Sequence, residues 1–191
     1  MPSTRTVPDS TRSREGVYMC SFHTLQKRIN QIRPAKLISI LGDADSAPFP
    51  EFRASDHLKL LIDDVCRPCR GFSHATKAHL NQLFEFTRDW NGRDPILIHC
   101  WAGSSRSPAI ALAVLLQKFS EDEASLVQRL SSRGPHIRPN ELIVALTDDE
   151  LRLGGRLTGA VRQIPCPEAL QRSDLVKIAT GSMMWRTLAG S

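Results

Sequence analysis

The sequence predicts an α/β fold in which a mostly parallel central sheet is flanked by helices and followed by a helical C-terminal part. Three observations support this. Short apolar runs alternate with segments of helical spacing along most of the chain. Residues 95–100 are nearly all apolar, as in a central parallel strand that is covered on both faces. Residues 109–116 are apolar all round, which is typical of a buried helix.

The individual elements follow from periodicity and from helix or strand breakers. The expected strands are 17–22, 35–41, 57–62 and 95–100, and the expected helices are 24–33, 74–90, one from about residue 107, 121–133 and 140–153. Pro34 ends the first helix and Gly42 ends the second strand. Pro108 suits the first turn of the helix that follows the clearest strand. Gly134 separates the next two helices, and Gly154 ends the second of them.

The length of 191 residues predicts one domain with a full core. Residues 1–15 are polar and are expected to form a flexible segment, residues 16–157 to form the domain, and residues 158–191 to form a C-terminal extension. The helical signal fades near Arg156. Residues 170–189 leave two alternatives open, one more helix or a loose tail.

Composition excludes several classes of function. The net charge is only +5, and no Lys/Arg block has interleaved aromatics, so a nucleic-acid partner is not expected. A mild positive excess suits an anionic partner instead. No secretory signal is present, and the longest apolar run, 109–116, is far shorter than the ~20 residues that cross a bilayer. Five cysteines, an odd number, fit a reducing compartment. We therefore expect a soluble, cytoplasmic protein without a membrane partner.

The segment 99–108 carries the chemistry. A buried strand brings Cys100 to the carboxyl edge of the sheet, where ligands bind in open α/β folds. Five residues, four of them small, separate Cys100 from Arg106, which opens a buried helix. Such a loop can point backbone N–H groups at a tetrahedral anion, with the helix N-terminus behind them. Gly103 permits a close approach, and the planar fork of Arg106 can bind two phosphate oxygens. A thiol in this setting ionises readily and becomes a nucleophile.

This segment, His-Cys-Trp-Ala-Gly-Ser-Ser-Arg-Ser, resembles the HCxxGxxR(S/T) signature of the cysteine-based protein tyrosine phosphatases and is similar to their compact dual-specificity branch. Residues 17–157 resemble the small bacterial tyrosine-phosphatase-like proteins. Asp63-Asp64 after a strand and the segment 138–140 at the start of a helix support the resemblance.

The resemblance implies phosphomonoester hydrolysis through a cysteinyl-phosphate, on phosphotyrosine and also on phosphoserine or phosphothreonine in proteins. Cys100 would attack phosphorus, Asp64 would protonate the leaving oxygen, and Ser107 would hydrogen-bond the sulfur. The loop residues would bind the phosphate. These loop residues are Trp101, Ala102, Gly103, Ser104, Ser105 and Arg106. The resemblance implies no metal and no cofactor.

Two further residues would support the loop. His99 is expected to face away from it and to fix its shape, rather than to act as a base. By resemblance, Asn140 would hold the loop backbone, and it also suits a helix cap. The loop contains no lysine, unlike phosphoinositide-specific relatives, so a polyanionic lipid head group is disfavoured.

The acid is less well defined than the nucleophile. Asp64 matches the family's acid loop better than Asp63, and the Trp-Pro-Asp triplet of the large tyrosine phosphatases is absent. Weaker candidates for the acid are Asp43, Asp45 and Asp56. Cys66 and Cys69 form a CxxC pair, but no second pair exists to complete a zinc site. A disulfide with Cys100 stays open.

Two other functions remain as alternatives. A sulfurtransferase or arsenate-reductase-like enzyme would use the same type of cysteine loop. A non-catalytic module would bind phosphate without turnover. The Arg106-Ser107 ending and the Asp64 loop argue against the first, and the intact Cys100 argues against the second.

Overall fold

The computed structural model describes residues 15–134, 136–165 and 175–178. Its strands are β1 (Val17–Ser21), β2 (Lys36–Leu41), β3 (His57–Leu61), β4 (Ile96–Cys100) and β5 (Leu175–Ile178). Its α-helices are α1 (Leu25–Ile32), α2 (Lys77–Phe86), α3 (Arg106–Lys118), α4 (Glu123–Arg133), α5 (Glu141–Glu150) and α6 (Arg156–Arg162). Three short 3₁₀ turns are η1 (Phe22–Thr24), η2 (Asp43–Asp45) and η3 (Ala54–Asp56).

The strands form one sheet in the order β3-β2-β4-β1-β5. Strands β1 to β4 are mutually parallel where they pair, and β5 runs antiparallel to β1. Because β4 lies between β2 and β1, its last residue, Cys100, stands at the carboxyl edge beside the ends of both neighbours. The predicted α/β fold with a mostly parallel sheet is confirmed.

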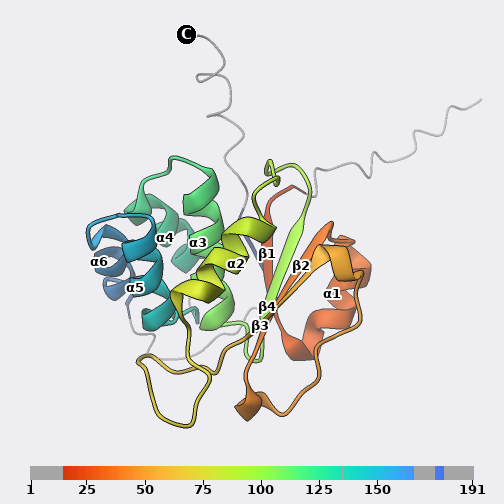
Figure 1. Ribbon diagram of the computed structural model, residues 1–191. Coiled ribbons are helices and arrows are strands. Elements are labelled where there is room, and N and C mark those ends of the chain that lie inside the picture. Colours follow the sequence, from red (N-terminus) through yellow and green to blue (C-terminus); the bar gives the residue numbers. More distant parts are fainter. Residues whose placement is uncertain (1–14, 135, 166–174, 179–191) are drawn as a thin grey trace, which may run out of the picture.

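Helices cover both faces of the sheet, but unequally. Helix α1 lies on one face, and α2 to α6 gather on the other (Figure 1). Alternate residues of each strand point to opposite faces. In β4, Ile96 and Ile98 join the large core under α3, whereas Leu97 joins a smaller core with Leu25 and Ile32 of α1. The all-apolar strand is therefore buried on both sides, as its sequence predicts.

Local capping explains where the helices depart from the predicted bounds. The helix expected over 74–90 begins at Lys77, because the Thr76 side chain and His79 form a capping box at its start. It ends at Phe86. The helix expected from residue 121 begins at Glu123, because the Asp122 side chain accepts a hydrogen bond from the Ser125 N–H.

The C-terminal part differs from the expectation of helices alone. Helix α6 crosses residue 157, the expected end of the domain, and its Leu157 and Val161 join the large core. Strand β5 lies in the segment left open as a helix or a loose tail, and Ile178 packs into the same core. None of the helices that the structure describes has the length and apolarity to cross a membrane.

Candidate active site

The loop 101–105 connects β4 to α3 and is fixed by its neighbours. Phe22 N–H donates to the Trp101 carbonyl (3.1 Å), Arg138 N–H to that of Ser104 (2.7 Å), and Asn140 N–H to that of Ser105 (3.1 Å). These three bonds come from the end of β1 and from the segment before α5. The loop is thus held from two sides before any ligand binds.

Gly103 is required at its position for two reasons. Its φ of +75° lies in the left-handed region. A Cβ there would also lie 2.8 Å from the backbone nitrogen of Ser21 and 2.9 Å from the carbonyl carbon of Cys20. Both contacts are with backbone, which cannot rotate away. The loop therefore packs against the end of β1 as closely as glycine allows.

The thiol of Cys100 lies under this loop and is fully buried. The Gly103 N–H donates to its sulfur at 3.2 Å, and the Ser107 Oγ lies 3.3 Å from it. The structure therefore places Ser107 where the resemblance expects it, in contact with the cysteine sulfur.

Arg106 is 2% exposed, and its guanidinium is already paired. Nη1 and Nη2 donate to the two oxygens of Asp45 at 2.6 and 3.1 Å, and Nη1 also donates to the Ile62 carbonyl at 2.8 Å. Burial alone would lower the pKa of Arg106, but the Asp45 hydrogen bond and the negative charges nearby outweigh burial and raise it. The arginine is therefore a permanent cation at the base of the loop.

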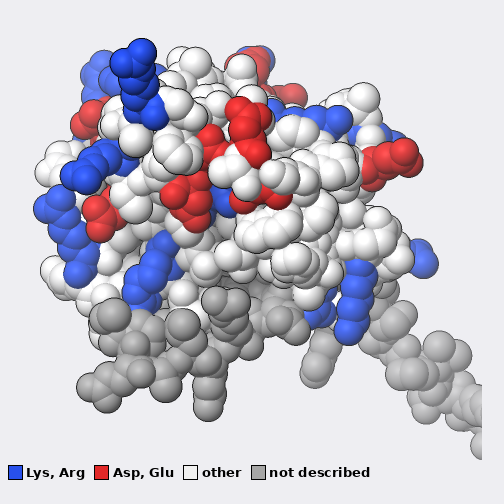
Figure 2. Space-filling view, turned by 90° about the horizontal axis from the view of Figure 1, so that it is seen from below, with Lys and Arg blue, Asp and Glu red and all other residues white. Residues whose placement is uncertain are grey.

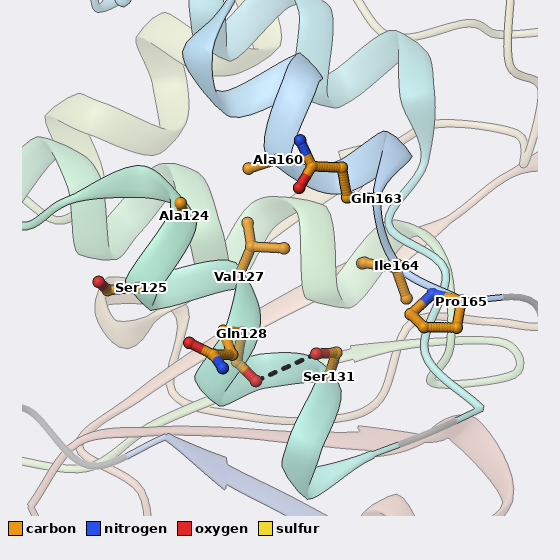
Figure 3. A pocket seen from close by; sticks show the side chains of 9 residues that line it. All are labelled: Ala124, Ser125, Val127, Gln128, Ser131, Ala160, Gln163, Ile164 and Pro165. Atoms are coloured by element: carbon orange, nitrogen blue, oxygen red, sulfur yellow. Dashed lines mark hydrogen bonds between the residues drawn. The ribbon is translucent and has the colours of Figure 1, made fainter.

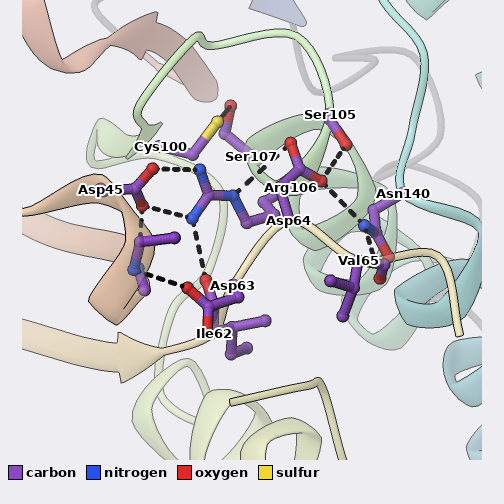
Figure 4. A network of polar contacts seen from close by, with 12 residues as sticks. Asp45, Ile62, Asp63, Asp64, Val65, Cys100, Ser105, Arg106, Ser107 and Asn140 are labelled. Atoms are coloured by element: carbon purple, nitrogen blue, oxygen red, sulfur yellow. Dashed lines mark hydrogen bonds and ion pairs between the residues drawn. The ribbon is translucent and has the colours of Figure 1, made fainter. Parts of the chain in front are cut away.

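Asp64 is the carboxylate that reaches the loop. Its Oδ1 accepts from the Ser105 hydroxyl (2.6 Å) and from the Asn140 Nδ2 (2.9 Å), and its Oδ2 lies 3.8 Å from the Arg106 Nε (Figure 4). The carboxylate keeps 37% exposure. It can therefore meet both the loop and an incoming substrate.

Asp63 points elsewhere and has a different set of contacts. It is 3% exposed, its Oδ1 accepts from the Ala44 N–H (3.0 Å), and its Oδ2 accepts from the Ser73 N–H (2.8 Å). It ties the segment after β2 to the segment after β3. Of the weaker acid candidates, Asp43 is exposed and Asp56 pairs with Arg53 at 3.0 Å.

Asn140 contacts the loop backbone through its own N–H, and its side chain makes two other sets of contacts. Its Oδ1 caps α5 by accepting from the Ile143 N–H (3.1 Å). Its Nδ2 donates to Asp64 and to the Val65 carbonyl (3.1 Å), so the side chain holds the segment after β3. The bond to the loop 101–105 comes from its backbone N–H, which donates to the Ser105 carbonyl. The expected helix cap is present.

His99 is fully buried, and because side chains alternate along β4 it points to the opposite face of the sheet from Cys100. Its Nε2 is 2.6 Å from the Ser39 Oγ, and that oxygen is 2.7 Å from the His57 Nε2. Burial lowers the pKa of His99 to about 3 and that of His57 to about 4, so both rings are neutral near pH 7. The supporting role of His99 stays a prediction.

Trp101 lies at the rim with two aromatic neighbours. Its ring stacks on Phe22, with ring centroids 5.5 Å apart, and meets the edge of His23 at 4.9 Å. Ala102 is exposed and Ser104 is half-buried beside it. The tryptophan therefore packs over the end of β1 as part of the wall of the loop.

Cys66 and Cys69 are exposed free thiols in the segment between β3 and α2. In the ranges that the structure describes, no group of three or more His, Cys, Asp or Glu residues is placed to hold a metal ion. Cys66 lines a 200 Å³ cavity together with residues of α5 and α6. The thiols therefore border the acid loop without contacting Cys100.

The sequence does not predict the partners of the central residues. It offers Asp45 only as a weaker candidate for the acid, and nothing in it assigns Ile62, Ser39 or His57 to the site. A larger cavity of 350 Å³ lies between α4 and α6 (Figure 3), and none of its lining residues contacts the Cys100 loop.

On the face at the carboxyl ends of the strands, acidic side chains gather near the centre (Figure 2).

Comparison with known proteins places the fold. No family model matches the sequence, and no curated protein matches it. Among solved structures, the chain is similar to the PTP-2 phosphatase of Cydia pomonella, with 23% identity, a TM-score of 0.54, and coverage of 75% of this chain and 90% of that one.

Two further structures are similar. DUSP15 has 19% identity and a TM-score of 0.56, with 83% of this chain and 97% of that chain covered. PTPMT1, solved in complex with PI(5)P, has 14% identity and a TM-score of 0.55, with 75% and 93% covered. The overall fold is therefore shared with these structures despite low sequence identity. The chain has the fold of the cysteine-based dual-specificity and tyrosine phosphatases.

Proposed function

We propose that this protein is a cysteine-dependent phosphatase that hydrolyses phosphomonoesters on proteins, with phosphotyrosine as its preferred substrate. The observation that carries the proposal is that three groups meet at one loop. They are the buried Cys100 sulfur with its two hydrogen-bonding neighbours, the Arg106 cation, and the Asp64 carboxylate, whose Oδ2 lies 3.8 Å from the Arg106 Nε. Nucleophile, anion-binding group and acid therefore surround the same space.

The chemistry follows from these positions. The Cys100 sulfur attacks phosphorus and forms an S–P bond, while the bond from phosphorus to the ester oxygen breaks. Asp64, protonated, gives its proton to that oxygen, so the alcohol or phenol leaves neutral. Arg106 and the loop N–H groups stabilise the equatorial oxygens of the transferring group, which is the main task of a phosphoryl-transfer site.

The second step releases phosphate. The ionised Asp64 takes a proton from water, the water oxygen attacks phosphorus, and the S–P bond breaks to return the thiolate. Ser107 lies 3.3 Å from the sulfur and can donate to it as the negative charge returns. Apart from the side chains and backbone groups of the protein itself, these two steps require only the substrate and water.

The test uses p-nitrophenyl phosphate in EDTA, with thiosulfate sulfurtransferase activity measured beside it. We expect phosphate release by the wild type, none by Cys100→Ser, and no sulfur transfer. The Cys100→Ser protein should still bind tungstate, because Arg106 and the loop N–H groups remain. Residual turnover within tenfold of wild type would exclude Cys100 as the nucleophile.

The substrate class is tested on phosphopeptides and on PI(5)P vesicles. Acidic side chains gather on the catalytic face (Figure 2), and they repel additional negative charge around the target phosphate. We expect phosphotyrosine peptides to be cleaved faster than the inositol lipid. A faster reaction with the lipid would assign the protein to lipid substrates.

A further inference from the structure

The guanidinium of Arg106 uses only part of its hydrogen-bonding capacity within the protein. It has five N–H donors in a fixed plane. Nη1 donates both of its N–H groups, one to the Asp45 Oδ2 and one to the Ile62 carbonyl. Nη2 donates one N–H to the Asp45 Oδ1 at 3.1 Å. The Nε–H and the second Nη2 N–H donate to no acceptor among these groups.

These two remaining donors lie side by side. Nε and Nη2 form one lateral edge of the guanidinium, and their N–H bonds are parallel, so that together they match two oxygens of one phosphate. In the described part of the chain, the Nε is buried without a hydrogen-bond partner. This edge of Arg106 is turned toward Cys100 (Figure 4). The Asp64 Oδ2 lies 3.8 Å from the Nε, which is too far for a hydrogen bond. A buried pair of donors without a hydrogen-bond partner at that place indicates a site for an anion.

Asp45 occupies the other edge, and it is itself fixed. Its Oδ2 accepts from the Gly42 N–H at 2.8 Å, and its carboxylate is 11% exposed on the η2 turn. Burial would raise the pKa of Asp45, but the hydrogen bonds from Arg106 and Gly42 outweigh burial and lower it. The carboxylate is therefore a permanent anion in a set position.

We propose that Asp45 is a positioning residue. It accepts hydrogen bonds from Nη1 and Nη2 of the Arg106 guanidinium and thereby directs the Nε/Nη2 edge toward the phosphoryl group. This proposal rests on the proposed phosphatase function. The Ile62 carbonyl supports the same orientation, because it accepts the one Nη1 N–H that Asp45 does not reach. Rotation of the guanidinium out of this plane would break three hydrogen bonds at once.

The same ion pair has an opposite interpretation, in which Asp45 competes with phosphate for Arg106. Competition requires the carboxylate to occupy the edge that the ligand needs. The three bonds described above leave that edge without a hydrogen-bond partner, and the carboxylate near it is that of Asp64, whose Oδ2 lies 3.8 Å from the Nε. Asp45 does not occupy the edge, so the geometry favours positioning. The two interpretations differ in sign: removal of Asp45 weakens anion binding in the first and strengthens it in the second.

The experiment measures tungstate affinity by calorimetry, which needs no turnover, together with kcat and KM for an aryl phosphate. For Asp45→Ala we expect about tenfold weaker tungstate binding, the equivalent of one charged hydrogen bond. We also expect kcat to fall by about 10²-fold, as for a displaced catalytic group. Asp45→Glu keeps the carboxylate and should recover part of both.

Asp43→Ala is the matched control. Asp43 stands on the same turn, is exposed, and makes no contact with Arg106 among the described residues. It should change neither quantity by more than about twofold, as for a screened surface charge. Asp45→Asn, of the same size, replaces Asp45→Ala if the latter fails to fold, and should also weaken tungstate binding.

The outcomes separate the two proposals. If Asp45→Ala and Asp45→Asn bind tungstate as tightly as the wild type, or more tightly, the positioning role is wrong. If the wild type binds tungstate but hydrolyses no phosphate ester, the phosphatase function is wrong, and the affinities still decide the role of Asp45. A wild-type protein that binds no tungstate would overturn both.

Discussion

The two adjacent aspartates after β3 show how one position along the chain changes the chemistry of a carboxyl group. Asp64 is partly exposed and meets the hydroxyl of Ser105 and the amide of Asn140. Asp63 is buried and accepts two backbone N–H groups from two different segments. The first carboxyl group can exchange a proton with a substrate, whereas the second serves as a brace.

We therefore expect Asp64→Asn to slow poor leaving groups selectively. A phenol leaves as an anion with a pKa near 10 unless it is protonated, so an alkyl-substituted phenyl phosphate should lose ~10²–10³-fold in kcat, the usual contribution of a general acid. p-Nitrophenyl phosphate needs the proton less and should lose less. The measurement is kcat across a series of aryl phosphates, with the alkaline limb of the pH profile flattened in the variant.

Asp63→Asn serves as the comparison for this series. An amide has one acceptor oxygen for two backbone donors, so one donor is left unpaired, at a cost of about 1–3 kcal/mol in the free energy of unfolding. Its loss of rate should be the same for all leaving groups. If the dependence on the leaving group follows Asp63 instead of Asp64, the two assignments must be exchanged.

At the scale of elements, the site depends on how closely the segments after β2 and β3 approach each other. A Cβ on Gly42 would lie 2.0 Å from the Asp63 Oδ1 and 2.6 Å from the Asp63 Cα. The φ of Gly42 is −105°, an ordinary value, so the need for glycine is steric and not conformational. The segment that carries Asp45 and the segment that carries Asp64 are joined at this contact.

Gly42→Ala should therefore separate the two segments. We expect a loss of about 1–3 kcal/mol in the free energy of unfolding, typical of an overpacked contact, and a lower kcat. Gly159→Ala in α6 is the control, because a Cβ there meets nothing within 4 Å and alanine favours a helix by about 0.5–1 kcal/mol. Urea denaturation measures both. A Gly42→Ala protein as stable as the wild type would contradict the argument.

The same scale explains what could be predicted from sequence. Cys100, Arg106 and Ser107 lie within one short segment, so their spacing alone specifies a loop and its chemistry. Asp45 lies 61 residues from Arg106, and Ser39 lies 60 residues from His99. Those contacts exist because β2 pairs with β4 in the register that sets Ser39 beside His99. No local pattern encodes that strand order, nor β5, whose four residues pair only with β1.

For the molecule as a whole, net charge and local charge point in different directions. The chain carries +5, yet acidic side chains gather on the face that holds the site (Figure 2). The buried Arg106 is a local exception, and its positive charge is offset in part by Asp45. For the proposed phosphatase, binding of the phosphate group would therefore depend on the loop and on Arg106, because acidic side chains lie at the centre of this face.

The buried polar chain from His57 through Ser39 to His99 makes the stability of the whole molecule depend on pH. Both histidines have folded-state pKa values, about 4 and about 3, below the unfolded value near 6.5. Above pH 6.5 the two states bind equal numbers of protons at these sites. Below it the unfolded chain binds more, so stability falls as pH falls from 6.5 toward 4.

Each histidine should remove about 1.4 kcal/mol of stability per pH unit in this range. Burial also lowers the pKa of His79, which adds in the same direction. Urea denaturation at pH 7, 6 and 5 measures the slope. In His57→Gln the slope of the free energy of unfolding against pH should decrease by the contribution of one proton. The carboxyl groups titrate at lower pH and contribute little to this slope. A free energy of unfolding that stays constant from pH 7 to pH 5 would show that the two rings are not held neutral, and the supporting role of His99 would then need another basis.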